Sequence, residues 1–184
     1  MDRVLAQWVT ALTVVVATAV SSAVAETAVH RELLENRGWS SFAGVASGGQ
    51  YSALSEITTA NVQRLERAWV VNTGDVVEGP AAEGGTAFQA TPILWEDKLY
   101  ICTPLHRVLA LDAGTGETLW SFDAWETVSA DIPRFGANCR GVSLWVDNAA
   151  EPDAVCRARI IKPDIMARLL AVDADTGRLC TDFG

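Results

Sequence analysis

The sequence predicts an all-β fold built from repeated antiparallel hairpins. From Arg67 onward, short apolar runs alternate with turn-forming residues, and no long segment shows the 3.6-residue period of an amphipathic helix. A seven-residue motif also occurs twice in the chain. Together these observations are typical of a protein in which one small β unit is repeated.

Five apolar runs have the length of a β-strand. They cover residues 68–72, 90–95, 98–103, 108–112 and 118–122. Glu96-Asp97 separates the second run from the third, and residues 112–116 separate the fourth from the fifth. Both separating stretches have the composition of tight turns. We therefore expect these runs to pair as antiparallel strands.

The repeated motif indicates the architecture. Ala110-Leu-Asp-Ala-Gly-Thr-Gly116 recurs 61 residues later as Ala171-Val-Asp-Ala-Asp-Thr-Gly177. In both copies a strand leads into an Asp-x-x-x-Gly turn and a second strand, which is the hairpin unit of a propeller or an array. Two unrelated hairpins with similar turns are the alternative. Closed propellers have about four to eight blades, and this chain supplies about two to three, so we expect a partial β-propeller.

The N-terminus has the features of a secretory signal. Residues 4–20 form an uncharged run that follows Arg3, and Ala23-Val-Ala25 is a cleavage sequence before Glu26. An uncleaved membrane anchor is the alternative, because about 17 residues is the lower limit for spanning a bilayer. We expect a signal peptide over residues 1–25, export to a periplasm, and contact with the inner membrane only through an uncleaved N-terminal segment.

An arm with a short helix is expected between the signal and the blades. Residues 59–65 suggest one or two helical turns with Thr58 or Thr59 as the N-cap. The predicted organisation is a signal peptide over 1–25, an N-terminal arm and short helix over 26–66, and propeller blades over 67–184 that are incomplete at the C-terminus.

The four cysteines indicate disulfides, because an even number in an exported chain is typical of them. Cys139 and Cys156 flank a short segment and are the pair we expect, whereas Cys102 has a buried free thiol as its alternative. The chain has no Cys-x-x-Cys pair and only two histidines, which argues against a structural zinc site.

Composition excludes one class of partner. The chain has 23 acidic and 14 basic residues, a formal net charge of −9, and no cluster of lysine or arginine. Such a surface repels nucleic acid. Hydrophobic residues make up 49% of the chain, which favours a packed core over disorder.

Four stretches together resemble a known family. They are residues 49–62 with 68–75, residues 90–104, the turn at 110–120, and Cys139-Arg-Gly-Val-Ser143. In this order they resemble the pyrroloquinoline quinone (PQQ)-dependent dehydrogenases, which are eight-bladed quinoprotein propellers. Cys139-Arg-Gly-Val-Ser143 and Gly177-Arg-Leu-Cys180 are most similar to the glucose, quinate and shikimate branch. The methanol branch carries a vicinal cysteine pair, which this sequence lacks.

The resemblance implies the N-terminal part, the first two to three blades, of a periplasmic dehydrogenase. Such an enzyme oxidises a sugar or polyol with PQQ and passes electrons to the membrane quinone. The alternative is a non-catalytic propeller module that binds a partner or assembles a complex of the cell envelope. Arg140 distinguishes the two, because a scaffold has no need of a cation aimed at the propeller axis.

The resemblance also implies three cofactor-binding residues. Arg140 matches the family arginine that pairs with a cofactor carboxylate, and its alternative role is an ordinary salt bridge. Gln89 stands where many relatives have a glutamate, and its amide can both donate and accept. His106 and Arg107 follow a strand and are expected to face the same channel, although Leu105 takes the place of the histidine of glucose-type relatives.

Catalytic groups are not assigned within the 184 residues. In the relatives, the aspartate base and the ligands of a divalent ion, usually calcium, come from later blades. The chain alone is therefore expected to be inactive. Trp120 is expected to pack between blades. Thr181 stands at the same position in the second copy of the motif, so we expect the corresponding contact there to be weaker or to be made by another residue.

Overall fold

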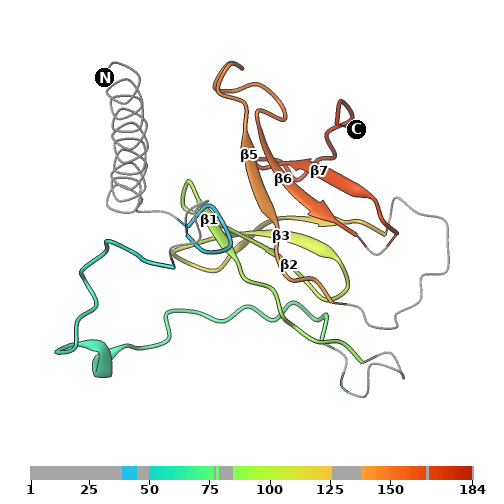
Figure 1. Cartoon of the computed structure of the whole chain (residues 1–184). Coiled ribbons are helices and arrows are strands. Elements are labelled where there is room, and N and C mark those ends of the chain that lie inside the picture. The colour runs from blue at the N-terminus through green and yellow to red at the C-terminus, as the bar shows by residue number, and fades with distance from the viewer. Residues whose placement is uncertain are drawn as a thin grey trace, which may run out of the picture.

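The computed structural model describes residues 39–44, 50–76, 78, 85–125, 138–164 and 166–183. The predicted signal peptide and residues 26–38 lie outside this part. Within it, a 3₁₀ helix η1 (Val62–Arg64) precedes seven strands in two antiparallel sheets. The two sheets lie next to one another (Figure 1). No helix of the described part is long and apolar enough to cross a membrane.

The first sheet contains four strands in chain order: β1 (Ile93–Trp95), β2 (Lys98–Cys102), β3 (Arg107–Asp112) and β4 (Thr118–Asp123). Glu96 and Asp97 link β1 to β2 with φ values of +47° and +59°. Positive φ at both central residues is the conformation that matches the twist of a two-residue hairpin. These strands confirm the predicted runs at 90–95, 98–103, 108–112 and 118–122. The strand in the first of these runs is shorter than predicted, because it covers only Ile93–Trp95.

The second sheet contains β5 (Ser143–Val146), β6 (Ala158–Pro163) and β7 (Leu169–Asp173) in the order β5-β6-β7. Leu179 forms an isolated antiparallel bridge with Val172 of β7. In the first sheet Thr118 of β4 pairs in the same way with Leu111 of β3. Leu179 therefore lies where a fourth strand begins, and the two sheets follow one pattern.

The core lies between the two sheets. One cluster of buried side chains draws on β1, β2 and β3 of the first sheet and on β6 and β7 of the second: Ile93, Tyr100, Cys102, Val108, Ala110, Ala158, Ile160 and Val172 are among its members. Residues 108–111 of β3 are all buried, whereas β6 alternates. A strand that is covered on both faces has continuous apolar residues. The sheets thus pack face to face as neighbouring blades.

The two copies of the motif form equivalent turns. Asp112 Oδ1 accepts from the backbone N–H of Thr115 at 2.7 Å and from its hydroxyl at 2.8 Å. Asp173 Oδ1 accepts from the backbone N–H and hydroxyl of Thr176, both at 2.8 Å. This equivalence confirms the predicted propeller repeat.

A tryptophan from one repeat docks on the turn of the next. Trp120 Nε1 donates to the carbonyl of Ala174 at 3.0 Å, which confirms that Trp120 packs between sheets. Trp69 Nε1 donates in the same way to the carbonyl of Ala113 at 3.2 Å. Trp69 therefore makes with the turn of the first sheet the same contact that Trp120 makes with the turn of the second sheet.

Two local predictions are wrong. Residues 68–72 form no strand, because a strand needs a paired neighbour and none lies alongside them in the described part of the chain. The N-cap of η1 is Asn61, not Thr58 or Thr59. Thr58 contributes its backbone: its N–H donates to Asn61 Oδ1 at 2.6 Å, and its carbonyl accepts from Val62 at 2.9 Å.

The predicted disulfide Cys139–Cys156 is also wrong, and so is the free thiol considered for Cys102. The bonds are Cys102–Cys139 and Cys156–Cys180, with Cα atoms 5.8 and 5.9 Å apart. Strand pairing is the reason. Cys180 donates its N–H to the carbonyl of Ala171 at 2.9 Å and so continues alongside β7, toward Cys156.

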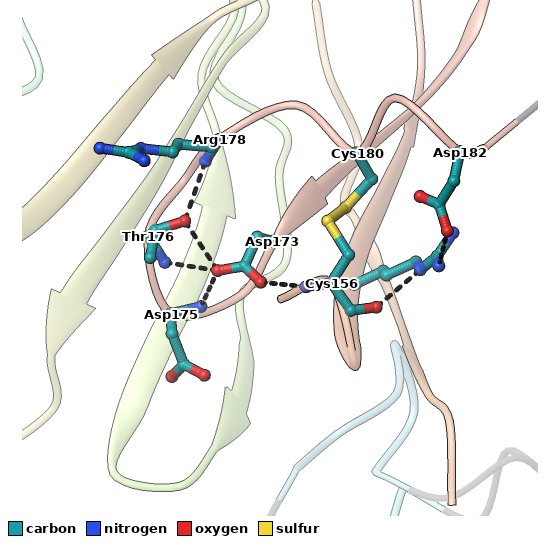
Figure 2. Close-up of a disulfide and its surroundings, with 8 residues drawn as sticks. Cys156, Asp173, Asp175, Thr176, Arg178, Cys180 and Asp182 are labelled. Carbon is teal, nitrogen blue, oxygen red and sulfur yellow. Dashed lines mark hydrogen bonds and ion pairs between the residues drawn. A yellow bond between two sulfur atoms is a disulfide. The ribbon is translucent and has the colours of Figure 1, made fainter. Parts of the chain in front are cut away.

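The second disulfide is joined to the repeated turn. Figure 2 shows Asp173 between the two: Oδ1 faces the turn, and Oδ2 accepts from the N–H of Cys156 at 2.6 Å. Burial favours the neutral carboxyl, but these hydrogen bonds outweigh burial and hold the pKa of Asp173 below its usual value.

Candidate cofactor-facing site

The hairpins give the two sheets a loop end and a turn end. The turn end carries the equivalent turns at 112–116 and 173–177. The loop end carries the starts of β1 and β5, the β2–β3 loop at 103–106 and the β6–β7 loop at 164–168. Gln89, Arg140 and His106 all belong to the loop end, because the first two precede β1 and β5 and the third lies in the β2–β3 loop.

The backbone of Arg140 is held at two points. Its carbonyl accepts from the N–H of Thr91 at 3.0 Å, and the preceding Cys139 is bonded to Cys102 at the end of β2. The side chain of Arg140 is exposed. None of the four ion pairs in the described part of the chain includes its guanidinium. A fixed backbone with an exposed guanidinium suits the binding of a carboxylate.

Gln89 is exposed and lies two residues before Thr91. Because Thr91 is hydrogen-bonded to Arg140, Gln89 and Arg140 stand on neighbouring backbone segments. An exposed amide and an exposed guanidinium on these neighbouring segments give the loop end donors for an anion and one acceptor for a hydroxyl or N–H group. That either residue binds a cofactor stays a prediction.

His106 is only 3% exposed, so it differs from the two residues above. Its Nδ1 lies 3.0 Å from the Nζ of Lys162, and its ring meets Trp125 edge-on, with centroids 5.2 Å apart. Burial, followed by the positive charge of Lys162, lowers the pKa of His106 from 6.5 to about 4. His106 is therefore neutral at pH 7, and the described ring is packed inside rather than presented to solvent.

Lys162 was not predicted from the sequence. It is 1% exposed, and burial lowers its pKa from 10.5 to about 8, although Asp164 and Asp123 oppose this shift. A signal for it was present: Ala158, Ile160 and Lys162 follow the period of two on the buried face of β6. The lysine therefore occupies a core position of its strand.

Asp164 belongs to the same neighbourhood and is committed to local contacts. It pairs with Arg168 at 2.6 Å and accepts the backbone N–H groups of Met166 and Arg168, each at 2.9 Å. Burial pushes the pKa of Asp164 upward, but the contacts with Arg168 and Met166 outweigh burial and hold the pKa below its usual value. Asp164 therefore stabilises the β6–β7 loop to which it belongs.

Arg107, which we expected to face the same channel as His106, forms an ion pair with Asp75. Its Nη2 and Nε atoms lie 2.6 and 2.9 Å from the two oxygens of Asp75, which is 5% exposed. It also donates to the carbonyl of Thr73. The hydrogen bond with Asp75 raises the pKa of Arg107 further. Arg107 thus ties residues 73–75 to the start of β3.

Two other features of the structure do not suit an anionic cofactor or a metal. A cleft of about 560 Å³ between residues 69–76 and the first sheet is lined by side chains such as Trp69, Phe88 and Leu99, and none of its described lining residues is charged. Cys156, Cys180 and Asp182 come close together at the turn end. The two sulfurs cannot ligate a metal because they form a disulfide.

Residues 39–184 match the family model described as PQQ: Glucose/ethanol/alcohol dehydrogenase, beta-propeller domain. The chain belongs to this PQQ β-propeller family. It is 36% identical over 149 residues to quinoprotein glucose dehydrogenase of Escherichia coli K12, covering 79% of this chain and 18% of that protein. It is 32% identical over 167 residues to quinate/shikimate dehydrogenase (quinone) of Acinetobacter baylyi, covering 79% and 19%.

The fold comparison agrees with this family. The quinohemoprotein alcohol dehydrogenase from Comamonas testosteroni superposes with a TM-score of 0.61 at 23% identity, over 80% of this chain and 19% of that chain. This match supports the propeller fold alone. The present PQQ-family chain spans about a fifth of the length of the relatives it matches. The resemblance and the partial propeller predicted from sequence are confirmed.

Proposed function

We propose that these blades form the N-terminal part of a periplasmic quinoprotein dehydrogenase. It would oxidise an alcohol group of a sugar or polyol with PQQ and pass the electrons to the respiratory quinone pool. Family membership supports the use of PQQ. Similar proteins named for glucose, glycerol and quinate support the substrate class. Two disulfides support an oxidising compartment.

The exposed guanidinium of Arg140 is the observation that carries the proposal. PQQ has three carboxylates, and a site for it needs cations held in place. Arg140 supplies one at the loop end, on a backbone fixed by Thr91 and by the Cys102–Cys139 bond. Gln89 would add a neutral donor beside it. The residues present therefore fit one carboxylate edge of the cofactor.

When bound, PQQ accepts two electrons and two protons from the alcohol. Arg140 and Gln89 bind and orient it in this proposal, and neither takes a proton from the substrate. We assign the general base and the ligands of calcium or another divalent ion to later blades of the complete protein. Arg140 and Gln89 supply neither a general base nor metal ligands, so the isolated chain is expected to be inactive.

The substitution Arg140→Ala tests the proposal in the complete protein that contains these blades. It should weaken PQQ binding by about 1.5–3 kcal/mol, the range for hydrogen bonds to charged groups. Fluorescence titration of the apoprotein with PQQ measures the dissociation constant. Arg178→Ala is the matched control, because Arg178 is an exposed arginine at the turn end. Equal PQQ affinity in the Arg140→Ala variant and the wild type would remove Arg140 from the cofactor site, and a wild type that binds no PQQ would favour the non-catalytic envelope module.

A further inference from the structure

A buried polar pair lies between the two sheets at the loop end. The Nζ of Lys162 is 3.0 Å from His106 Nδ1 and 3.3 Å from the carbonyl of Pro163. Because a lysine ammonium only donates, Nδ1 is the acceptor and the imidazole carries its proton on Nε2. That Nε2 atom is buried and has no hydrogen-bond partner among the described residues.

Packing alone does not account for this pair. Asp164 and Asp123 lie near enough to favour the charged lysine, yet neither forms one of the four ion pairs in the described residues with it. An apolar residue at each position would avoid the loss of hydration and the unsatisfied Nε2–H. The sequence places two polar groups where apolar ones would avoid these costs, which points to a use beyond stability.

The backbone of His106 is also strained. Its φ of +66° is in the left-handed region that non-glycine residues seldom adopt. The loop is closed by two hydrogen bonds of 2.9 Å, from the N–H of His106 to the carbonyl of Thr103 and from the N–H of Thr103 to the carbonyl of Arg107. This conformation turns the ring toward Lys162 of the other sheet. Strain of this kind persists only where surrounding contacts hold it in place.

Each member of the pair is linked through its own sheet to the segment 139–141 that carries Arg140. On the first sheet, Thr103 follows directly after Cys102, and the sulfur of Cys102 is bonded to that of Cys139. The loop that His106 closes is therefore covalently joined to the residue before Arg140.

On the second sheet, Lys162 follows Ile161, which pairs with Ser143 of β5. Ser143 is three residues after Arg140. The Lys162–His106 contact therefore connects the β2–β3 loop to the strand pair from which the segment 139–141 extends.

We propose that Lys162 and His106 are positioning residues that fix the segment 139–141, and with it the guanidinium of Arg140, for an anionic ligand. The proposal rests on the function proposed above for Arg140. The ammonium adds a fixed positive charge to the interior of the loop end, which favours a ligand bearing carboxylates. The neutral imidazole is the acceptor that holds this charge in place.

The chain offers a matched control for the experiment. Lys98 Nζ lies 2.8 Å from Asp175 Oδ1, so a second lysine joins the two sheets at the turn end. Lys98→Met removes the same charge and one contact between sheets, but it leaves the loop end intact. Lys162→Met removes the buried charge, and His106→Leu removes its acceptor. His106→Gln keeps an acceptor, because its amide oxygen can accept from the ammonium.

The dissociation constant for PQQ is measured on the apoprotein of the complete protein, by the titration used for Arg140→Ala. Lys162→Met and His106→Leu should raise it roughly tenfold or more, because a small displacement of a positioned group has large effects. Lys98→Met should change it by less than about twofold, as expected for an exposed ion pair. His106→Gln should recover most of the affinity lost in His106→Leu.

The outcomes separate this proposal from the preceding one. If Arg140→Ala weakens binding while Lys162→Met and His106→Leu behave like Lys98→Met, positioning is refuted and the proposed function stands. If Arg140→Ala has no effect although PQQ binds, Arg140 does not hold the cofactor and positioning is refuted with it. If the wild type binds no PQQ, the proposed function itself is refuted.

A readout without cofactor or substitution tests whether the pair on which the proposal depends exists, and it can refute the proposal even if a variant does not fold. Nitrogen-15 NMR of the histidine side chains in the wild type should show His106 as the Nε2–H tautomer, still neutral at pH 6. Lys162, Asp164, Asp123 and Arg168 are the charged groups around the pair. An Nδ1–H tautomer, or protonation with an ordinary histidine midpoint, would show that the pair does not form.

Discussion

Single glycines determine how closely one repeat approaches the next. Gly116 and Gly177 have φ values of +75° and +69°. A Cβ atom at Gly116 would lie 2.7 Å from the indole of Trp69, and one at Gly177 would lie 2.6 Å from that of Trp120. Each glycine therefore meets two requirements, a left-handed backbone and room for a flat ring.

The substitution Gly177→Ala should lower the free energy of unfolding by about 2–4 kcal/mol, because backbone strain and overlap with Trp120 add together. Gly74→Ala separates the two causes. Gly74 has a φ of +72°, but a Cβ atom at this position would have no atom of the described residues within 4 Å. That variant should lose only about 1 kcal/mol. Urea denaturation of the purified chain measures both values, and equal losses would show that the indole contact is unimportant.

Strands and disulfides show which elements can be predicted from sequence. The runs at 98–103, 108–112 and 118–122 were predicted well, because alternation and turn composition are local properties. Residues 68–72 have the same composition but lack a paired strand in the described part of the chain. The cysteine pairing failed for a related reason: it depends on which strand ends meet in space, and chain separation is a poor guide to that.

Removing either disulfide should destabilise the chain by a similar amount. The bonds close loops of 37 and 24 residues. The loss of chain entropy in the unfolded state then predicts about 3–4 kcal/mol for Cys102→Ala with Cys139→Ala, and slightly less for Cys156→Ala with Cys180→Ala. Chemical denaturation measures the loss.

Peptide mapping without reduction checks the connectivity itself. The expected linked peptides join residue 102 to 139 and residue 156 to 180. A linked peptide joining residue 139 to 156 would contradict the strand pairing described above, because Cys102 would then be left without its partner beside Arg140.

At the scale of the whole molecule, two lysines join the sheets at opposite ends in different ways. Lys98 meets a carboxylate at the exposed turn end, whereas Lys162 meets a neutral imidazole inside the loop end. The family motif singled out Arg140 from the sequence, and the structure places this residue at the loop end. The Lys162–His106 contact could not be predicted, because it joins residues 56 apart and exists only when the two sheets pack.

The Lys162–His106 contact should make the free energy of unfolding depend on pH at values above those at which most carboxylates titrate. The folded state lowers the pKa of His106 to about 4, against 6.5 in an unfolded chain. Between these values the unfolded chain binds a proton that the folded chain excludes, so the free energy of unfolding falls as pH drops from about 6.5 to about 4. The fall should be on the order of 2–3 kcal/mol.

The carboxylates contribute little to this fall. Asp164 and Asp173 have folded pKa values below their usual 3.8, so most of the stability that they contribute is lost below pH 4. In His106→Gln the acceptor for Lys162 remains while the titrating group is gone, so the free energy of unfolding should be nearly constant between pH 6.5 and 4. Urea denaturation at several pH values in this range compares the variant with the wild type. The same slope in both chains would mean that another group titrates there and that the ring of His106 is not buried against Lys162.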